Sequence, residues 1–356
     1  LVTPSDEATL NYALPTFTWE AATDTVSGIA SYEIRIDGVS ATRDATTAYV
    51  PDMAVMNGYH TWEVKARDGA GNWGDYSTSF NFTMEAAIPE SVITVESPNG
   101  GEHIAPNATY NITWYATNEL GLKANPITIR YSTNEGTSWY LLASNEANDG
   151  VFSWNVPTIE SSTCRVSVEA EDLYSTKKSD SSDANFIVSG RYVTRTSDSG
   201  GGSLRNAMNY ANSHPGTRIE FYMPTSESTS EAGVEWYKIK PLSALPSITA
   251  NGTIIDATTQ PTSDAYNNPY GPEIEIDGSS AGSSADGLSI GNNVTDCTIE
   301  GLVINRFARN GIFVGSGTNN KCQILSNYIG TDVTGTIAAG NGGSTYAGIY
   351  LWGSGN

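Results

Sequence analysis

Apolar and polar residues alternate along short segments in the first part of the chain, and turns separate these segments. Within residues 1–85 the alternating segments are 16–19, 31–36, 59–66 and 79–83. An alternation with period two gives a half-buried antiparallel strand one apolar and one polar face. About 85 residues is the size of one β-sandwich, so the pattern predicts a sandwich here.

A second set of alternating segments follows a short linker at residues 86–90. These segments are 93–95, 110–114, 127–132, 150–157, 164–170 and 185–188. They have the same character as the first set and predict a second sandwich.

The pattern changes after residue 190, where short β-branched runs are separated by Gly and Asn. The run at 287–290 recurs at 311–314 and 348–351, and the run at 297–305 recurs at 322–330. A spacing of about 24 residues with several short strands per repeat is typical of a solenoid, in which each repeat is one coil.

The repeat makes a specific prediction about register. Ile299 should stack on Ile324, and Ile304 on Ile329, with both pairs pointing inward and buried. Residues 331–347 lengthen one repeat, so we expect them to form a loop that projects from one corner.

One helix is predicted ahead of the repeats, over residues 203–211. Ser203 is a good N-cap, and Leu204, Ala207 and Ala211 follow at helical spacing. Pro215 and Gly216 end the helix, and the strand pattern begins at 218.

Several segments resemble known families. PTFTWE, ASYEIRIDG and YHTWEVKARDGAGN resemble immunoglobulin-like or fibronectin type III-like repeats of prokaryotic surface proteins, and SPNGGE, ITIRYSTNEGTSW, FSWNVP and CRVSVEA resemble another fibronectin-like module. SGGGSLRNAMNYAN and TRIEFYMP resemble the N-terminal cap of pectin-lyase-like β-helices, and GLVINRFARNGIFV resembles their coils.

Together, the patterns and resemblances predict an all-β chain. We expect an immunoglobulin- or fibronectin III-like sandwich at 1–87 and a second sandwich at 88–190. A right-handed parallel β-helix with an N-terminal capping helix should occupy 191–356. Its last coil, at 348–352, is followed by no helix and no polar closing segment. We therefore expect either that the chain is a piece of a longer protein or that this coil docks on a neighbouring subunit.

Composition narrows the function. The net charge is −21 and only 16% of residues are charged. Acidity spread along the chain argues against nucleic acid as a partner, because phosphates attract basic stripes. The same acidity favours solubility and the binding of divalent cations. No stretch approaches 18 apolar residues, so we expect no membrane span.

Catalytic candidates are sparse. Glu273 and Glu275 alternate along one predicted strand and would share a face, as an acid–base pair requires. No Arg or Lys lies in the same short window to neutralise a uronate. Ordinary solvent-facing alternation therefore explains this pair better, and we expect no catalytic residue.

Calcium is the one cofactor that the sequence suggests. Asp68 and Asn72 lie in a Gly-rich turn, and Asp24 and Asp75 are further oxygen ligands that could join them. No EF-hand spacing is present, so a plain turn is the alternative.

N-glycosylation is a possible modification. Sequons occur at Asn81, Asn107, Asn111, Asn251 and Asn293, about the number that chance gives in this composition.

Cys297 and Cys322 fall at equivalent positions of successive coils. Adjacent strands lie about 4.8 Å apart, which permits a disulfide, and a ladder of two buried thiols is the alternative. Cys164 is expected to be a buried strand residue.

Three functions fit these features. The first is an extracellular structural or adhesive protein of the cell surface, such as an S-layer, stalk or filament component. Its partners would be other copies of itself, other surface proteins or polysaccharide. The second is a secreted polysaccharide lyase or glycoside hydrolase with accessory sandwiches, and the third is a carbohydrate-binding module array.

Overall fold

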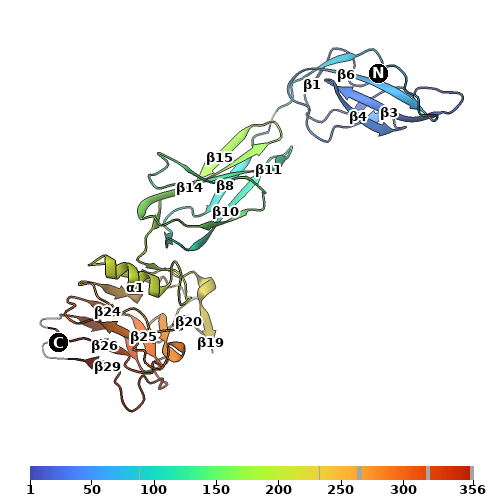
Figure 1. The fold of residues 1–356 in the computed structure, drawn as a ribbon. Helices are drawn as coiled ribbons and strands as arrows, with labels where there is room; N and C mark the ends of the chain where they lie inside the picture. The colour runs from blue at the N-terminus through green and yellow to red at the C-terminus, as the bar shows by residue number, and fades with distance from the viewer. Residues whose placement is uncertain (88, 232, 263–266, 318–320, 353–356) are drawn as a thin grey trace.

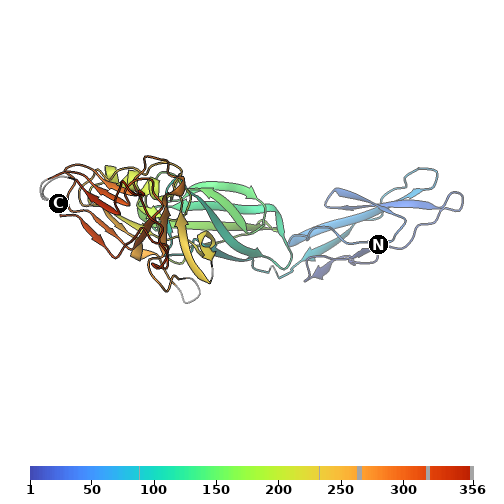
Figure 2. The same cartoon turned by 90° about the horizontal axis from the view of Figure 1, so that it is seen from below.

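The structure is a computed structural model that describes residues 1–356 except 88, 232, 263–266, 318–320 and 353–356. Its strands form three groups that share no ladder within the described ranges. Figures 1 and 2 show these groups as three bodies in a row, with the N-terminus in the first and the C-terminus in the last. We call them the N-terminal body (β1–β7), the middle body (β8–β16) and the C-terminal body (β17–β29).

The N-terminal body is two sheets packed face to face. Its strands are β1 (Ala8–Leu10), β2 (Phe17–Thr18), β3 (Ile29–Ile36), β4 (Val39–Asp44), β5 (Ala48–Tyr49), β6 (Gly58–Asp68) and β7 (Phe80–Met84). The larger sheet has the order β1-β7-β6-β3-β4, and β2 pairs with β5 in the smaller one. Phe17 joins the sheets, because its ring lies 5.1 Å from that of Trp62 and 5.6 Å from that of Phe82.

The middle body is also a two-layered sandwich. Its strands are β8 (Val92–Ser97), β9 (His103–Ile104), β10 (Thr109–Thr117), β11 (Leu122–Ser132), β12 (Tyr140–Glu146), β13 (Val151–Asn155), β14 (Ser161–Asp172), β15 (Lys177–Ser181) and β16 (Phe186–Val188). One sheet has the order β13-β10-β8 and the other β12-β11-β14-β16-β9, with β15 pairing β14. Alternate residues of β14 are buried, as the periodicity predicts. Cys164 is one of them, which confirms its expected place in the core.

The C-terminal body contains short strands and one α-helix. The strands are β17 (Tyr192–Val193), β18 (Arg218–Phe221), β19 (Thr229–Glu231), β20 (Val234–Ile239), β21 (Ile254–Asp256), β22 (Ile274–Asp277), β23 (Leu288–Ile290), β24 (Thr298–Glu300), β25 (Leu302–Asn305), β26 (Ile312–Val314), β27 (Gln323–Leu325), β28 (Tyr328–Ile329) and β29 (Ile349–Leu351). The helices are α1 (Leu204–Ser213) and the short 3-10 helices η1 (Thr225–Glu227), η2 (Ala257–Thr259) and η3 (Gly278–Ser280).

The strands of this body form three parallel sheets, apart from the antiparallel pair β19–β20. The sheets are β17-β18-β21-β24-β27, β20-β22-β25-β28 and β23-β26-β29. From β21 onward the chain visits the three sheets in the same order in each pass. One pass is one coil, and each strand pairs with its counterpart in the next coil.

The predicted register is confirmed. Ile299 pairs with Ile324 and Ile304 with Ile329 in parallel ladders. Ile299 and Ile304 are fully buried, whereas Ile324 and Ile329 are half-buried and pack on the same core. Coil-on-coil stacking of aliphatic side chains therefore builds this core.

Asparagine side chains clamp one coil to the next. Asn327 accepts a hydrogen bond from the Leu302 amide at 2.9 Å and donates to the Ile299 carbonyl at 2.8 Å. In the loop 331–347, the Asn341 side chain holds the preceding coil in the same way, accepting from the Phe307 amide and donating to the Ile304 carbonyl. These side-chain amides add hydrogen bonds between coils to those of the backbone ladders.

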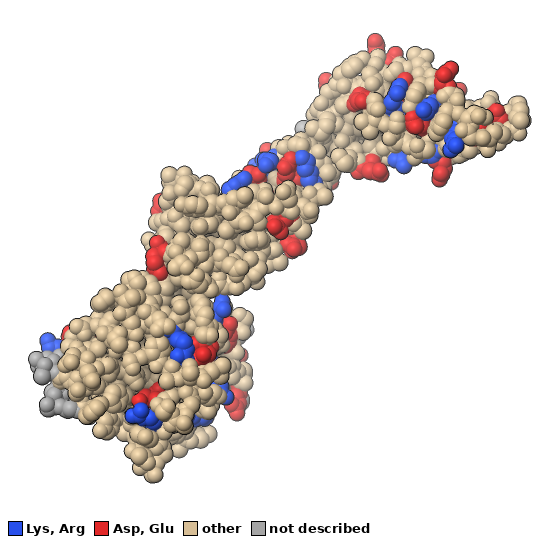
Figure 3. All heavy atoms as spheres, viewed as in Figure 1, with Lys and Arg blue, Asp and Glu red and all other residues tan. Residues whose placement is uncertain are grey.

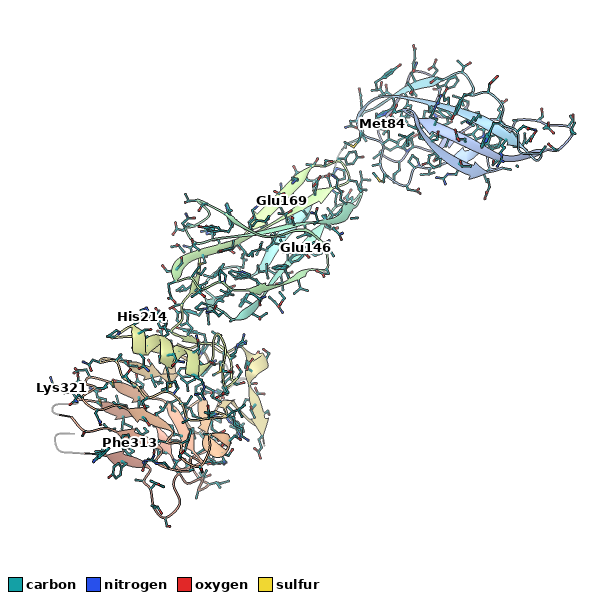
Figure 4. The ribbon with its side chains drawn as sticks, viewed as in Figure 1. Met84, Glu146, Glu169, His214, Phe313 and Lys321 are labelled. Atoms are coloured by element: carbon teal, nitrogen blue, oxygen red, sulfur yellow. The ribbon has the colours of Figure 1, made fainter. Side chains whose placement is uncertain are left out.

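The predicted helix is present and begins where expected. The Ser203 side chain accepts a hydrogen bond from the Asn206 amide, as an N-cap does. The buried face of α1 packs on the same core as the coils, and His214, which follows the helix, lies on the side of the middle body (Figure 4). No helix in the described part of the chain is both long and apolar enough to cross a membrane.

The loop 331–347 differs from its prediction. Instead of only projecting from a corner, it places Val333, which is 6% exposed, against Trp236 and Val303 on the outer face of the β20–β22–β25 sheet. The apolar outer residues of that sheet give Val333 a surface to bury. The last coil, predicted at 348–352, is exposed along β29, where Ile349 is 42% and Leu351 54% exposed, and residues 353–356 lie outside the described residues.

Both junctions between the bodies are packed. Tyr174 of the middle body is 5% exposed and belongs to the apolar core of the N-terminal body. Met84, at the end of β7, belongs to the same core and lies where the two bodies meet (Figure 4).

At the second junction, the His103 ring stacks on Tyr222 at 3.6 Å and meets the edge of Tyr192 at 4.7 Å. Burial lowers the pKa of His103, which favours its neutral form in this apolar contact. Gly201 lies so close to the 106–108 backbone that a Cβ would approach the Asn107 carbonyl carbon to 2.3 Å. Only glycine fits at this contact.

Candidate functional site

The strongest cluster of chemically active side chains surrounds Glu275 on the outer face of the β20–β22–β25 sheet. Glu275 is 1% exposed although it points away from the aliphatic core. Trp236 and Val333 pack over this face of the sheet. With Glu275 they line a cavity of about 280 Å³, which Glu231 and Asp332 also line. A buried carboxylate of this kind needs hydrogen-bond partners and compensating charge.

Four donors meet the Glu275 carboxylate. Oε2 accepts from Trp236 Nε1 at 2.8 Å and lies 3.3 Å from Lys238 Nζ. Oε1 accepts from Asn305 Nδ2 at 2.9 Å and from Arg306 Nη1 at 2.8 Å. Each oxygen of the Glu275 carboxylate is therefore engaged by two donors, and neither is left free to bind a ligand in the cavity.

Asp277 completes a cluster of two carboxylates and two cations. It lies 3.6 Å from Arg306 Nη1 and accepts the Ser279 amide at 2.9 Å. Burial alone would raise the pKa of Asp277, but the Ser279 bonds and the nearby Arg306 and Lys238 hold it below its ordinary value. The cluster thus pairs two acidic side chains with two basic ones, which is the charge pattern of a structural ion network.

This arrangement corrects the expectation that Glu275 faces solvent. The side chain is buried, and two cations from outside its short sequence window lie beside it. Lys238 and Arg306 come from neighbouring coils: Lys238 pairs with Glu275 across β20 and β22, and Arg306 follows β25. Aligning residues 234–239 with the later coils would have revealed this ladder.

Glu273 lies apart from the Glu275 cluster. It lines a cavity of about 550 Å³ together with Thr258, Gln260 and Tyr328. Burial raises the pKa of Glu273, although the Asn268 amide donates to both of its oxygens at 2.9 and 3.0 Å and opposes the shift. Within the described ranges it is the one carboxylate that lines this cavity, whereas glycoside hydrolysis ordinarily uses two.

The residues suggested for calcium share one cleft of the N-terminal body. Two of them are committed to their own turns. Asp68 accepts the Asn72 amide at 2.8 Å and the Asn72 side chain at 3.0 Å, and Asp24 Oδ1 accepts backbone amides of residues 26–28. Asp75 lies at the exposed rim. The described residues contain no group of three or more His, Cys, Asp or Glu suited to a metal ion, and calcium stays a prediction.

Cys297 and Cys322 precede β24 and β27, at equivalent positions of successive coils. Both are thiols in this structure. Burial raises the pKa of Cys297 to about 12, and the neighbouring Cys322 adds to this effect. Such a thiol ionises little near neutral pH and is a poor nucleophile. A disulfide between them stays a prediction.

The sequons differ in exposure. Asn81 is half-buried, and the exposed ones are Asn107, Asn111, Asn251 and Asn293. Two of the exposed side chains also hold structure: Asn107 accepts from the Thr158 hydroxyl and Asn251 from the Thr295 amide. Glycosylation at any of them stays a prediction.

Comparisons with known proteins find distant similarity only. No family model and no curated protein matches the chain. Among solved structures, the fibronectin(III)-like modules of Clostridium thermocellum CbhA match at 12% identity and a TM-score of 0.26, over 52% of this chain and 91% of that one. The FN1–FN3 domains of chicken CNTN1 match at 16% identity and 0.23, over 50% and 63%.

A Bacteroides ovatus protein, SGBP-B of a mixed-linkage glucan utilization locus, was solved with a mixed-linkage heptasaccharide. It matches at 12% identity and a TM-score of 0.19, over 54% of this chain and 46% of that one. Similarities this remote assign neither fold nor function to this chain.

The Glu275 network makes a stability prediction. Glu275→Ala removes the acceptor of the buried Trp236 and Asn305 donors and should lower the free energy of unfolding of the C-terminal body by about 3 kcal/mol. Glu231→Ala, at an exposed carboxylate on the same cavity, should change it by less than about 0.5 kcal/mol. Urea unfolding of both variants checks this. Equal, small effects would mean that the Glu275 network contributes nothing to stability.

Proposed function

We propose that this protein is an extracellular structural or adhesive component of a cell surface. In this proposal, residues 1–87 and 88–190 are immunoglobulin- or fibronectin III-like sandwiches. Residues 191–356 are the first coils of a right-handed parallel β-helix, and α1 is its N-terminal cap. The cyclic order of the three parallel sheets supports the β-helix, and the face-to-face sheets support the sandwiches.

The observation that carries the proposal is the end-to-end arrangement with packed junctions. Tyr174 inserts into the core of the N-terminal body, and His103 stacks on Tyr222 at the second junction. Bodies joined in this way keep a fixed spacing, whereas bodies on open linkers move independently. A spacer or stalk needs such stiffness, and a freely diffusing enzyme with accessory modules has no need of it.

The surface charge is compatible with this role. Acidic and basic side chains intermingle on the face shown in Figure 3, with no basic stripe there. The net charge of −21 keeps such a protein soluble and argues against nucleic acid. We propose other surface proteins, other copies of the chain and polysaccharide as its partners.

Small-angle X-ray scattering of the whole chain tests the stiffness. The scattering should fit a single extended conformation. Tyr174→Ala removes a large buried aromatic from the first junction, a change that costs about 3–5 kcal/mol in protein cores. The scattering of the Tyr174→Ala variant should therefore fit only a range of conformations and not a single one.

Two controls isolate the packing contribution. Tyr174→Phe keeps the ring and removes a hydroxyl that has no partner in the described structure. Tyr140→Ala removes an exposed aromatic of the same body. Both should scatter like the unaltered chain. Unaltered protein that already requires a broad ensemble would contradict the spacer function.

A polysaccharide lyase or glycoside hydrolase is the second candidate, because Glu273 has a raised pKa at a cavity wall. A lone carboxyl is an incomplete acid–base pair. We therefore expect no release of reducing ends or unsaturated uronates from pectin, alginate or chitin. Activity that disappears in Glu273→Gln and persists in Glu231→Gln would establish the enzymatic function instead.

A further inference from the structure

The N-terminal body contains a cleft of about 540 Å³ that the proposed function has not used. One wall is the segment 19–24, and the other is the segment 72–77, which lies along β6. Backbone hydrogen bonds fix the second wall, because Gly74 N donates to Ala66 O at 2.9 Å and Ser77 N to Val64 O at 2.8 Å. The volume lies in the range of ligand-binding clefts.

Aromatic rings line this cleft, namely those of Trp19, Tyr32, Trp73 and Tyr76. Trp73 is 39% exposed, which is high for so large an apolar side chain. Lys65 Nζ lies 4.8 Å from the Trp73 ring centre and 4.6 Å from that of Tyr76.

Lys65 is itself held by Glu33 at 3.1 Å, and the Tyr76 hydroxyl donates to the same carboxylate. The two rings are therefore positioned in advance, which reduces the entropy lost when a ligand binds.

A buried donor at the cleft wall lacks an acceptor. Trp19 is 5% exposed, and in the described part of the chain its indole N–H has no hydrogen-bond partner. Buried polar groups are nearly always hydrogen-bonded, so this N–H, on a residue that lines the cleft, is a donor with an unmet need for an acceptor.

Two carboxylates at the rim are also available. Glu20 and Asp75 are exposed, line the cleft, and form no ion pair or side-chain hydrogen bond with the described residues. Asp24 and Asp68, by contrast, are occupied by their own turns. The cleft thus offers carboxylate acceptors, one indole donor and aromatic faces within one concave surface.

We propose that this cleft binds a neutral sugar unit of an extracellular glycan. The Trp73 ring, the most exposed of the four, packs against the apolar C–H face of a pyranose, the sugar hydroxyls donate to Glu20 and Asp75, and a sugar oxygen accepts from Trp19. Four acidic side chains against the single Lys65 disfavour uronates and sulfated sugars. The inference rests on the proposed adhesive function and names its ligand class.

Affinity electrophoresis of the whole chain tests the proposal. The probes are three neutral polymers (hydroxyethylcellulose, laminarin and yeast mannan) and two acidic ones (polygalacturonate and alginate). We expect at least one neutral polymer to retard the protein and neither acidic one to do so. Retardation by the acidic polymers alone, or by no polymer, would overturn the proposal.

Variants locate the binding. Trp73→Ala should weaken binding to the retarding polymer at least tenfold, and Trp19→Phe, which keeps a ring and removes the N–H, several-fold. Tyr140→Ala on the middle body should leave binding unchanged. Circular dichroism verifies that each variant is folded, and unchanged binding by folded Trp73→Ala would overturn the assignment. Scattering does not depend on glycan binding, so this proposal and the spacer function fail separately.

Discussion

Stacking of aliphatic side chains from coil to coil determines the strand register and the core of the C-terminal body. Ile255, Ile299 and Ile324 lie in one parallel ladder and Ile276, Ile304 and Ile329 in another, all in register. Side chains alternate between the faces of a strand, so a slip of one residue would move Glu275 into the aliphatic core and expose the isoleucines. The register therefore also decides which charged residues meet on the outer face.

The outer face shows what this register produces. Lys238 and Glu275 become neighbours because their strands pair, and Arg306 joins them at the end of the next coil. The resulting network, covered by Trp236 and Val333, converts a carboxylate that looked like a catalytic candidate into a buried structural group. The same ladder thus stabilises this face and engages both carboxylate oxygens of Glu275.

Sequence periodicity predicted much of this fold, for a physical reason. Strong alternation, as in β6 and β14, and the helical spacing after Ser203 arise from burial on one face, and the repeat fixes the pairing of Ile299 with Ile324. Strands β4 and β15 lack buried alternation because they lie at exposed positions, and their sequences did not predict them.

The candidate sites were harder to predict, because their parts are far apart in the sequence. Trp236, Asn305 and Arg306 lie 30 to 39 residues from Glu275. Asp24, Asp68 and Asp75, which the sequence suggested as calcium ligands, line one cleft of the N-terminal body, but the sequence did not reveal the aromatic wall beside them. Local patterns identify strands, whereas clefts depend on which loops the completed fold brings together.

Native-state hydrogen exchange tests the central claim, the in-register stacking of coils, most directly. The amides of β25 are held between β22 and β28, so they should open only with the whole C-terminal body and exchange among the slowest in the chain. The amides of β19, in an exposed hairpin outside the parallel ladders, should exchange much faster. Exchange in β25 as fast as in β19 would contradict the coil register and the rigid body built on it.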